Sequence, residues 1–263
     1  MDYKELWKPL PIDQIIMADY DFIVFLSTDD YLDWQTMPSI DDQLAKLAKP
    51  DVSAVHNRAT EVFAMPKEHL TKDQRLNIRK MVGEGYARLF DLDPTSALEI
   101  VNKAGIYAAA RNQEIARGWQ LKATAISAGG FFLIGGLAWL LRAWLRHRLG
   151  ETAFILLMGG CAGAVGALFS VLTRLGTNSL DPSAGERLHR LEGAARVVAG
   201  AIGAVFAQLA VQLSLILGVL KGFGLPALMF IALVAGASER LVPTIIKKTE
   251  DDAASSGKGN TPT

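Results

Sequence analysis

Five charged residues near the ends of apolar segments have the types and spacing to do chemistry. They are Arg174, Glu192, Arg196, Glu239 and Arg240. If these segments cross a membrane, the five residues form one charged layer at the cytoplasmic interface. A charge at membrane depth costs roughly 3 kcal/mol or more, so such side chains usually face a partner or water. The layer either caps a helical bundle by snorkelling to the interface, or it forms a site for an ion, a lipid or a protein partner.

The layer contains three arginines and two glutamates, so pairing within it leaves a surplus of one positive charge. Glu192 and Arg196 are four residues apart and can pair along one helix. The surplus cation could contact an anionic lipid head group. A second polar feature lies in mid-span, where Gln208 and Gln212 are also four residues apart. These amides could hydrogen-bond to another helix or another copy, or they could line a pore.

The sequence shows no motif typical of an enzyme. It contains no HExxH, P-loop, GxSxG or CxxC pattern. The histidines are far apart and are expected at the surface: His56, His69, His147 and His189. We therefore predict no catalytic residue, no cofactor and no metal, and a protein that is not an enzyme. The enzymatic alternative is action on lipid, with Glu192 or Glu239 as a base.

Two further groups of reactive residue types have structural interpretations. Cys161 is the single cysteine, so no intramolecular disulfide can form, and it should pack as a small, weakly polar residue in an apolar segment. Asp29, Asp30 and Asp33 lack the spacing of a calcium loop. We expect them to form a solvated acidic surface, which could dock a basic partner.

The charged layer depends on four apolar segments that are long enough to span a membrane. They cover about residues 123–141, 152–173, 197–218 and 225–246, and a span needs roughly 20 residues to cross a 30 Å hydrocarbon core. Small residues crowd these segments, notably Gly159, Gly163, Gly200 and Gly203. Because lipid gives helices no hydrophobic reason to associate, small residues that permit close approach predict a tight four-helix bundle. The same residues could instead mediate self-association.

The charge distribution predicts the orientation of these spans. Residues 1–118 carry a net charge of −5 and the remainder +5, which argues against a nucleic-acid-binding domain with a basic face. Ten Lys or Arg residues flank the spans on the side of the termini, against four on the other side: Arg142, Arg146, Arg148 and Lys221. The positive-inside rule then predicts a multi-pass protein of the inner (plasma) membrane with both termini in the cytoplasm. The N-terminus has no signal-peptide pattern, which agrees with this expectation.

The first 118 residues are predicted to be helical, which makes the whole chain all-α. Ser39 or Asp42 is expected to cap one short helix that ends at Pro50, and Asp51 a second. Thr71 with Gln74 has capping-box spacing. The apolar run 22–26 is too short to span. A last helix should start at Pro94; it either continues to about residue 141 as a stalk or breaks at Gly118. The expected domains are a cytoplasmic helical domain (1–118), the span bundle (119–248) and a disordered tail (249–263).

Several motifs in and before the spans resemble those of an uncharacterised family of bacterial multi-spanning membrane proteins. They are Ala108-Ala-Ala-Arg-Asn-Gln-Glu-Ile-Ala-Arg117, Arg174-Leu, Gly193-Ala-Ala-Arg196 and Gly236-Ala-Ser-Glu-Arg-Leu-Val-Pro243. The resemblance covers about residues 95–246. It implies a lineage and brings no established activity.

These patterns favour a membrane-anchored interaction protein, a scaffold or sensor without catalytic activity. Its expected partners are the bilayer, an anionic lipid, other copies of itself and a cytoplasmic protein, but no nucleic acid. The alternative is an oligomeric channel, transporter or membrane-disrupting effector. With four spans, such a pore would need several copies.

Overall fold

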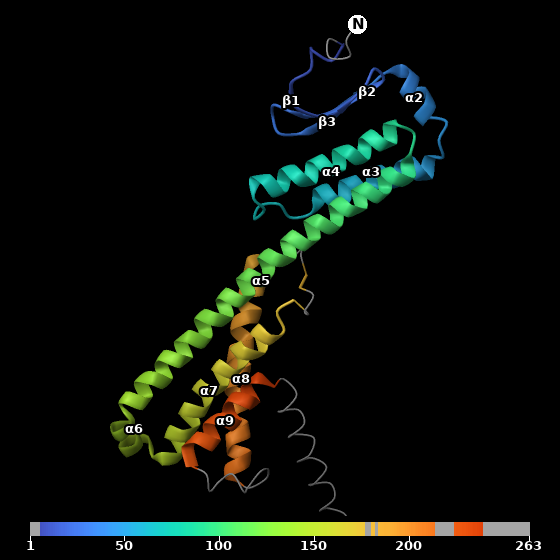
Figure 1. Cartoon of the computed structure of the whole chain (residues 1–263). Helices are drawn as coiled ribbons and strands as arrows, with labels where there is room; N and C mark the ends of the chain where they lie inside the picture. Colours follow the sequence, from blue (N-terminus) through green and yellow to red (C-terminus); the bar gives the residue numbers. More distant parts are fainter. Residues whose placement is uncertain (1–5, 177–179, 182–183, 214–223, 239–263) are drawn as a thin grey trace, which may run out of the picture. The chain divides into compact units, whose positions relative to one another are not determined.

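The computed structural model describes residues 6–176, 180–181, 184–213 and 224–238 (Figure 1). These residues form eight helices and one three-stranded sheet, so the prediction of a mostly helical chain is confirmed. Contacts divide the chain into two units, residues 1–115 with 181–183 and residues 116–180 with 184–263. The predicted tail, 249–263, lies outside the described residues.

The first unit contains an antiparallel sheet, so the all-α prediction is wrong. Its strands are β1 (Ile12–Ala18), β2 (Phe22–Ser27) and β3 (Leu32–Thr36), joined in the order β1-β2-β3. The central strand β2 is buried along its whole length. A strand buried on both faces appears in the sequence as a continuous apolar run without alternation. This is why the segment 22–26 gave no strand signal.

The two faces of β2 belong to different clusters of the core. Phe22 and Val24 pack with the helices of the first unit, whereas Ile23 and Phe25 pack with Trp7 from the segment before β1. Trp7 is fixed in turn, because its Nε1 donates to the Asp19 carbonyl oxygen at 2.9 Å. Side chains alternate between the faces of a strand, so one five-residue run serves both clusters.

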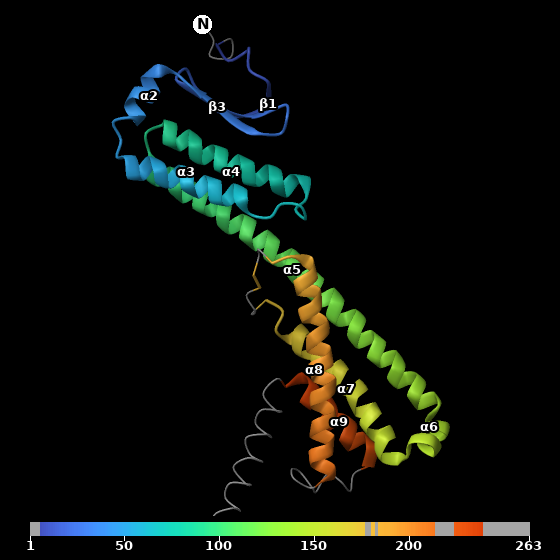
Figure 2. The ribbon, with the colours of Figure 1, turned by 180° about the vertical axis from the view of Figure 1, so that it is seen from behind.

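Three helices follow the sheet: α2 (Pro38–Leu44), α3 (Lys49–Ala64) and α4 (Lys72–Phe90). The sheet covers one side of α4, while α3 and the first part of the next helix lie on its other side (Figures 1 and 2). Two glycines allow this close packing. A Cβ on Gly83 would lie 2.9 Å from Leu32 Cδ1 of the sheet, and one on Gly85 would lie 2.5 Å from Val101 Cγ2.

The predicted helix starts have mixed outcomes. The capping box of Thr71 and Gln74 is confirmed, with both reciprocal hydrogen bonds present. The starts at Ser39 and Asp51 are wrong, since both residues lie within the first turn of their helices. Pro38 and Pro50 explain the shift, because proline favours the first helical positions, where no N–H donor is needed.

The long helix α5 (Pro94–Leu140) is uninterrupted over 47 residues. Of the two alternatives for this region, the structure has the continuous helix. A glycine inside a helix costs only about 1 kcal/mol, which the rest of the helix can offset at Gly118. Residues at the start of α5, such as Val101 and Ala108, belong to the core of the first unit. Ala128 belongs to a core cluster of the second unit.

The second unit adds four helices. They are α6 (Arg142–Leu149), α7 (Glu151–Thr173), α8 (Glu186–Gln212) and α9 (Gly224–Ala237). Among the described residues, α5, α7 and α8 are long and apolar enough to cross a membrane. Helix α9 is apolar but has 14 residues, and residues 239–246 of the predicted fourth span lie outside the described ranges.

The short helix α6 was not predicted, and it carries the basic patch that disagrees with the charge rule. Each of its three arginines lies over an aromatic ring: Arg142 over Trp139 at 5.1 Å, Arg146 over Phe154 at 4.8 Å and Arg148 over Trp144 at 6.0 Å. Arginine and tryptophan together are typical of a membrane–water interface.

Candidate functional site

The predicted charged layer is present in part among the described residues. Arg174 is the C-cap of α7, and Arg196 lies on α8. Both line one small recess, together with Arg117 and Gln120 of α5. Glu192 is on α8 one turn before Arg196, while Glu239 and Arg240 lie outside the described residues. The structure therefore places Arg117 with Arg174 and Arg196 around one recess.

This recess is close-packed. Its volume is about 10 Å³, which is the space of about one water molecule. The recess fits a polar joint between helices better than a reaction chamber.

A buried polar contact between α5 and α8 holds this joint together. A Cβ on Gly193 would lie 2.5 Å from the Gln120 carbonyl oxygen and 2.9 Å from Thr124 Oγ1. Thr124 is fully buried, and its hydroxyl donates to that same carbonyl at 2.8 Å. Only glycine at position 193 lets the two backbones approach this closely. Arg196 lies three residues further along α8 and lines the recess together with Arg117.

His189 corrects another prediction. Its side chain is 1% exposed, so the expected surface role is wrong for this histidine. Its Nδ1 lies 3.6 Å from Glu192 Oε2, and its ring stacks with Trp119 at a centroid distance of 6.3 Å. Because Trp119 and Gln120 are adjacent on α5, His189 belongs to the same joint. The other three histidines are exposed.

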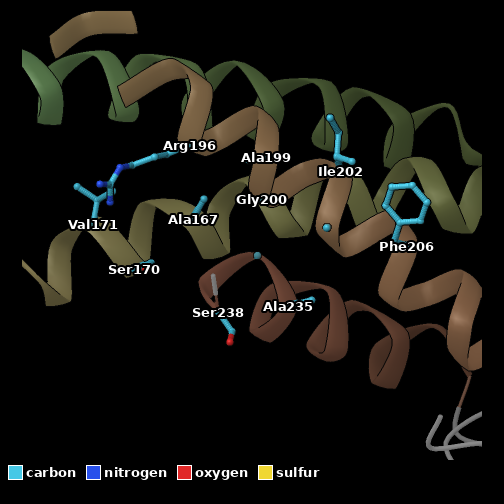
Figure 3. A pocket seen from close by; sticks show the side chains of 12 residues that line it. Ala167, Ser170, Val171, Arg196, Ala199, Gly200, Ile202, Phe206, Ala235 and Ser238 are labelled. Atoms are coloured by element: carbon cyan, nitrogen blue, oxygen red, sulfur yellow. The ribbon is translucent and has the colours of Figure 1, made fainter. Parts of the chain in front are cut away.

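A larger pocket lies between α7, α8 and α9, with a volume of about 560 Å³. Figure 3 shows Arg196 at one end and Phe206 at the other. The pocket is lined mainly by small or apolar residues: Ala167, Val171, Ala199, Gly200, Ile202, Gly203, Phe206, Ala235 and Gly236. Ser170, Ser238 and Arg196 supply its polar groups. Arg196 also lines the small recess, so one guanidinium group connects the two.

The two amides predicted in mid-span, Gln208 and Gln212, lie in different surroundings. Gln208 is fully buried, and its Nε2 donates to the Leu228 carbonyl oxygen of α9 at 3.1 Å. Gly159 of α7 makes room for this side chain, since a Cβ there would overlap the Gln208 amide. Gln212 is half-buried near the end of α8. Gln208 thus bridges helices inside one copy of the bundle.

The four glycines predicted to pack helices are all buried. A Cβ on Gly163 would lie 2.6 Å from the Gly200 carbonyl oxygen, and one on Gly200 would lie 2.7 Å from Ala167 Cβ. Gly203 lines the larger pocket instead. Cys161 is buried on α7. A Cβ on Gly135 of α5 would lie 3.1 Å from the Cβ of Cys161.

The described residues contain no cluster of three or more His, Cys, Asp or Glu side chains that could hold a metal ion. What the site offers is arginine donors beside an apolar pocket. Guanidinium groups bind phosphate and carboxylate oxygens through paired hydrogen bonds. The arrangement can therefore hold an anionic group.

Comparisons with family models, with curated proteins and with solved structures find no match to this chain. The resemblance to a bacterial membrane-protein family stays a prediction.

Proposed function

We propose that the protein is a multi-pass membrane protein that anchors an interaction domain and has no catalytic activity of its own. Four spans with both termini in the cytoplasm agree with the charge distribution and with the three described helices that could cross a membrane. Exposed apolar side chains support this placement. On α5 alone they include Phe132, Leu133, Leu137 and Leu140, each more than half exposed. Such a surface is typical of contact with lipid.

One observation carries the interaction role: a single helix belongs to two hydrophobic cores. The first part of α5 contributes Ala97, Val101, Ala104 and Ala108 to the core of the first unit. Further along, Ala128 packs with Ala164 and Val197 of the apolar helices. A folded domain with its own core, joined to the spans by unbroken helix, suits a scaffold or sensor that reports a binding event to the membrane.

Site-directed labelling tests the orientation. Cys161 is the only cysteine, so Cys161→Ala gives a background for single-cysteine variants. Tyr31→Cys reports the side of the membrane on which the first unit lies, because Tyr31 is 71% exposed. His147→Cys does the same for helix α6, where His147 is exposed. In intact cells, a membrane-impermeant maleimide should label position 147 and leave position 31 unlabelled until the membrane is opened. The reverse pattern would refute the proposed orientation.

Photo-crosslinking tests the interaction role. A photoreactive amino acid at Tyr20 or Tyr31, both exposed on the first unit, should yield discrete protein adducts in membranes. The matched control is Phe132, which should yield lipid adducts or adducts to a second copy. If neither tyrosine position gives a protein adduct in native membranes, the scaffold proposal fails.

The channel alternative is the weaker proposal. Gln208, one of the two residues that suggested a pore, is buried and donates to Leu228 within one copy. A pore would then have to run between copies. We expect no ion conductance from the reconstituted protein in liposomes.

A further inference from the structure

The pocket between α7, α8 and α9 is open toward the surroundings of the bundle. Ile202 and Phe206 line it and remain 52% and 59% exposed. Its depth comes from residues without large side chains, among them Ala167, Ala199 and Gly203. If α7 and α8 cross the membrane, as proposed above, this groove opens to lipid and must be filled by something apolar.

Polarity changes along the groove. One end carries the guanidinium group of Arg196 (Figure 3). The adjoining recess adds Arg117 and Arg174. The other end, at Phe206, is apolar. The two ends are ten residues apart on α8, or about 15 Å at 1.5 Å per residue. A ligand that matches the groove is therefore elongated, apolar over most of its length and anionic at one end.

The charge at one end of the groove decides between two apolar occupants. A membrane-spanning helix from a second copy would place apolar side chains beside Arg196. A phospholipid instead offers one acyl chain for the apolar length and a head group for the Arg196 end. The arginines at one end select a negative head group, since guanidinium groups bind phosphate oxygens well.

We propose that the groove binds one acyl chain of an anionic phospholipid, and that Arg196 holds its phosphate with Arg117 and Arg174 nearby. This inference rests on the membrane insertion proposed above. It makes the charged layer a lipid site with a defined orientation, in which the head group lies at the level of the α5–α8 joint. A bound lipid would also fill the space between α8 and the end of α9.

Native mass spectrometry of the full chain in detergent tests this site. The probes are phosphatidylglycerol and phosphatidylcholine with identical acyl chains, titrated separately. The wild type should bind one phosphatidylglycerol molecule about tenfold more tightly than phosphatidylcholine. Arg196→Gln should abolish this preference, and Arg196→Lys should keep part of it because the positive charge remains. Equal binding of the two lipids by the wild type would overturn the proposal.

Two substitutions that add a large side chain, one inside the groove and one next to it, provide a matched comparison. Ala199 lines the groove and is exposed, so Ala199→Phe should block the chain without disturbing the buried core. The neighbouring Val198 is 47% exposed and does not line the groove, so Val198→Phe is the control. We expect the first variant to lose the tightly bound lipid and the second to keep it. Equal lipid retention by the two phenylalanine variants would also overturn the proposal. Ala199→Leu is a smaller change at the same place, and lipid retention equal to that of the wild type would overturn the proposal as well.

Insertion into the membrane is measured separately. Incorporation of each variant into lipid nanodiscs tests the spans alone. A wild-type chain that fails to enter nanodiscs refutes the proposed membrane function. A chain that enters nanodiscs but does not discriminate between the two lipids refutes only the lipid site.

Discussion

The Gly163 carbonyl oxygen of α7 occupies the space that a side chain at Gly236 of α9 would need. Gly200 of α8 lies at the same contact, since a Cβ on Gly200 would lie 3.1 Å from the Gly163 carbonyl oxygen and 3.2 Å from the Gly236 carbonyl oxygen. Three helices therefore touch backbone to backbone at three glycines. In lipid, such close contact replaces apolar burial as the force that holds helices together.

Gly236→Ala should destabilise the bundle by about 1–3 kcal/mol, because the added methyl group forces α7 and α9 apart. Thermal unfolding of the full chain in nanodiscs would show this as a lower melting temperature. Gly129→Ala is the control, since a Cβ added at Gly129 of α5 would meet no atom within 4 Å outside its own stretch of helix. It should leave the melting temperature unchanged or raise it. Equal losses in the two variants would contradict the glycine contact.

Gly159 and Gln208 should behave as a coupled pair. Gly159→Ala alone pushes a methyl group into the Gln208 amide, at a cost of about 1–3 kcal/mol. Gln208→Ala alone loses the hydrogen bond to Leu228, worth roughly 0.6–1.7 kcal/mol in a membrane, and leaves a cavity. The double variant should cost less than the sum, because each change relieves the other. A double-mutant cycle from melting in nanodiscs measures the coupling, and strict additivity would disprove it.

The capping box at the start of α4 should matter for the first unit. Thr71 accepts a hydrogen bond from the Gln74 backbone N–H at 3.2 Å, and Gln74 Oε1 accepts one from the Thr71 backbone N–H at 2.9 Å. Thr71→Ala should cost about 1 kcal/mol. Hydrogen exchange in the first turn of α4 should become about fivefold faster. Thr71→Ser, which keeps the hydroxyl, should exchange like the wild type.

Acid should weaken the turn between β2 and β3. The Arg79 guanidinium hydrogen-bonds to Asp30 and, against a smaller opposing effect of burial, holds the pKa of that carboxyl below its usual 3.8. A lowered pKa means that the carboxylate form stabilises the fold. This contribution is fully present above pH 3.8 and is lost as the pH falls through the lowered pKa.

Asp30→Asn tests this pH dependence. At pH 7 the variant should melt below the wild type, and the difference should vanish at acidic pH, once the wild-type carboxyl is protonated. Asp29→Asn, in the same exposed turn, is the matched control. Asparagine also accepts the left-handed backbone of position 30, where φ is 67°, so the comparison isolates the charge.

The features that the sequence predicted well depend on local pattern alone. Length and apolarity identified the regions of α7 and α8, and the spacing of Thr71 and Gln74 identified a cap. The strand β2 was missed because burial on both faces removes alternation. Its partners β1 and β3 are separated from it by short turns, but their own alternation is weak, since both are exposed in the middle.

The candidate site was predicted only in part, for two physical reasons. Arg117, Gln120 and Thr124 are spaced by three and four residues around the start of an apolar segment. This polar stripe could have placed them on one helix face. The larger pocket had no such signal. It exists because Ala167, Ala199 and Gly203 are small at places that only the packing of three helices brings together.

The continuity of α5 imposes an order on synthesis of the protein. The core of the first unit needs residues up to Ala108, whereas the apolar part of the same helix ends at Leu140. At 5–20 residues per second, a ribosome adds the intervening stretch in roughly 2–6 s. The first unit can therefore begin to fold before the apolar part of α5 has left the ribosome. Once folded, this unit would resist being drawn through a translocation channel, so the timing of synthesis agrees with the cytoplasmic placement proposed above.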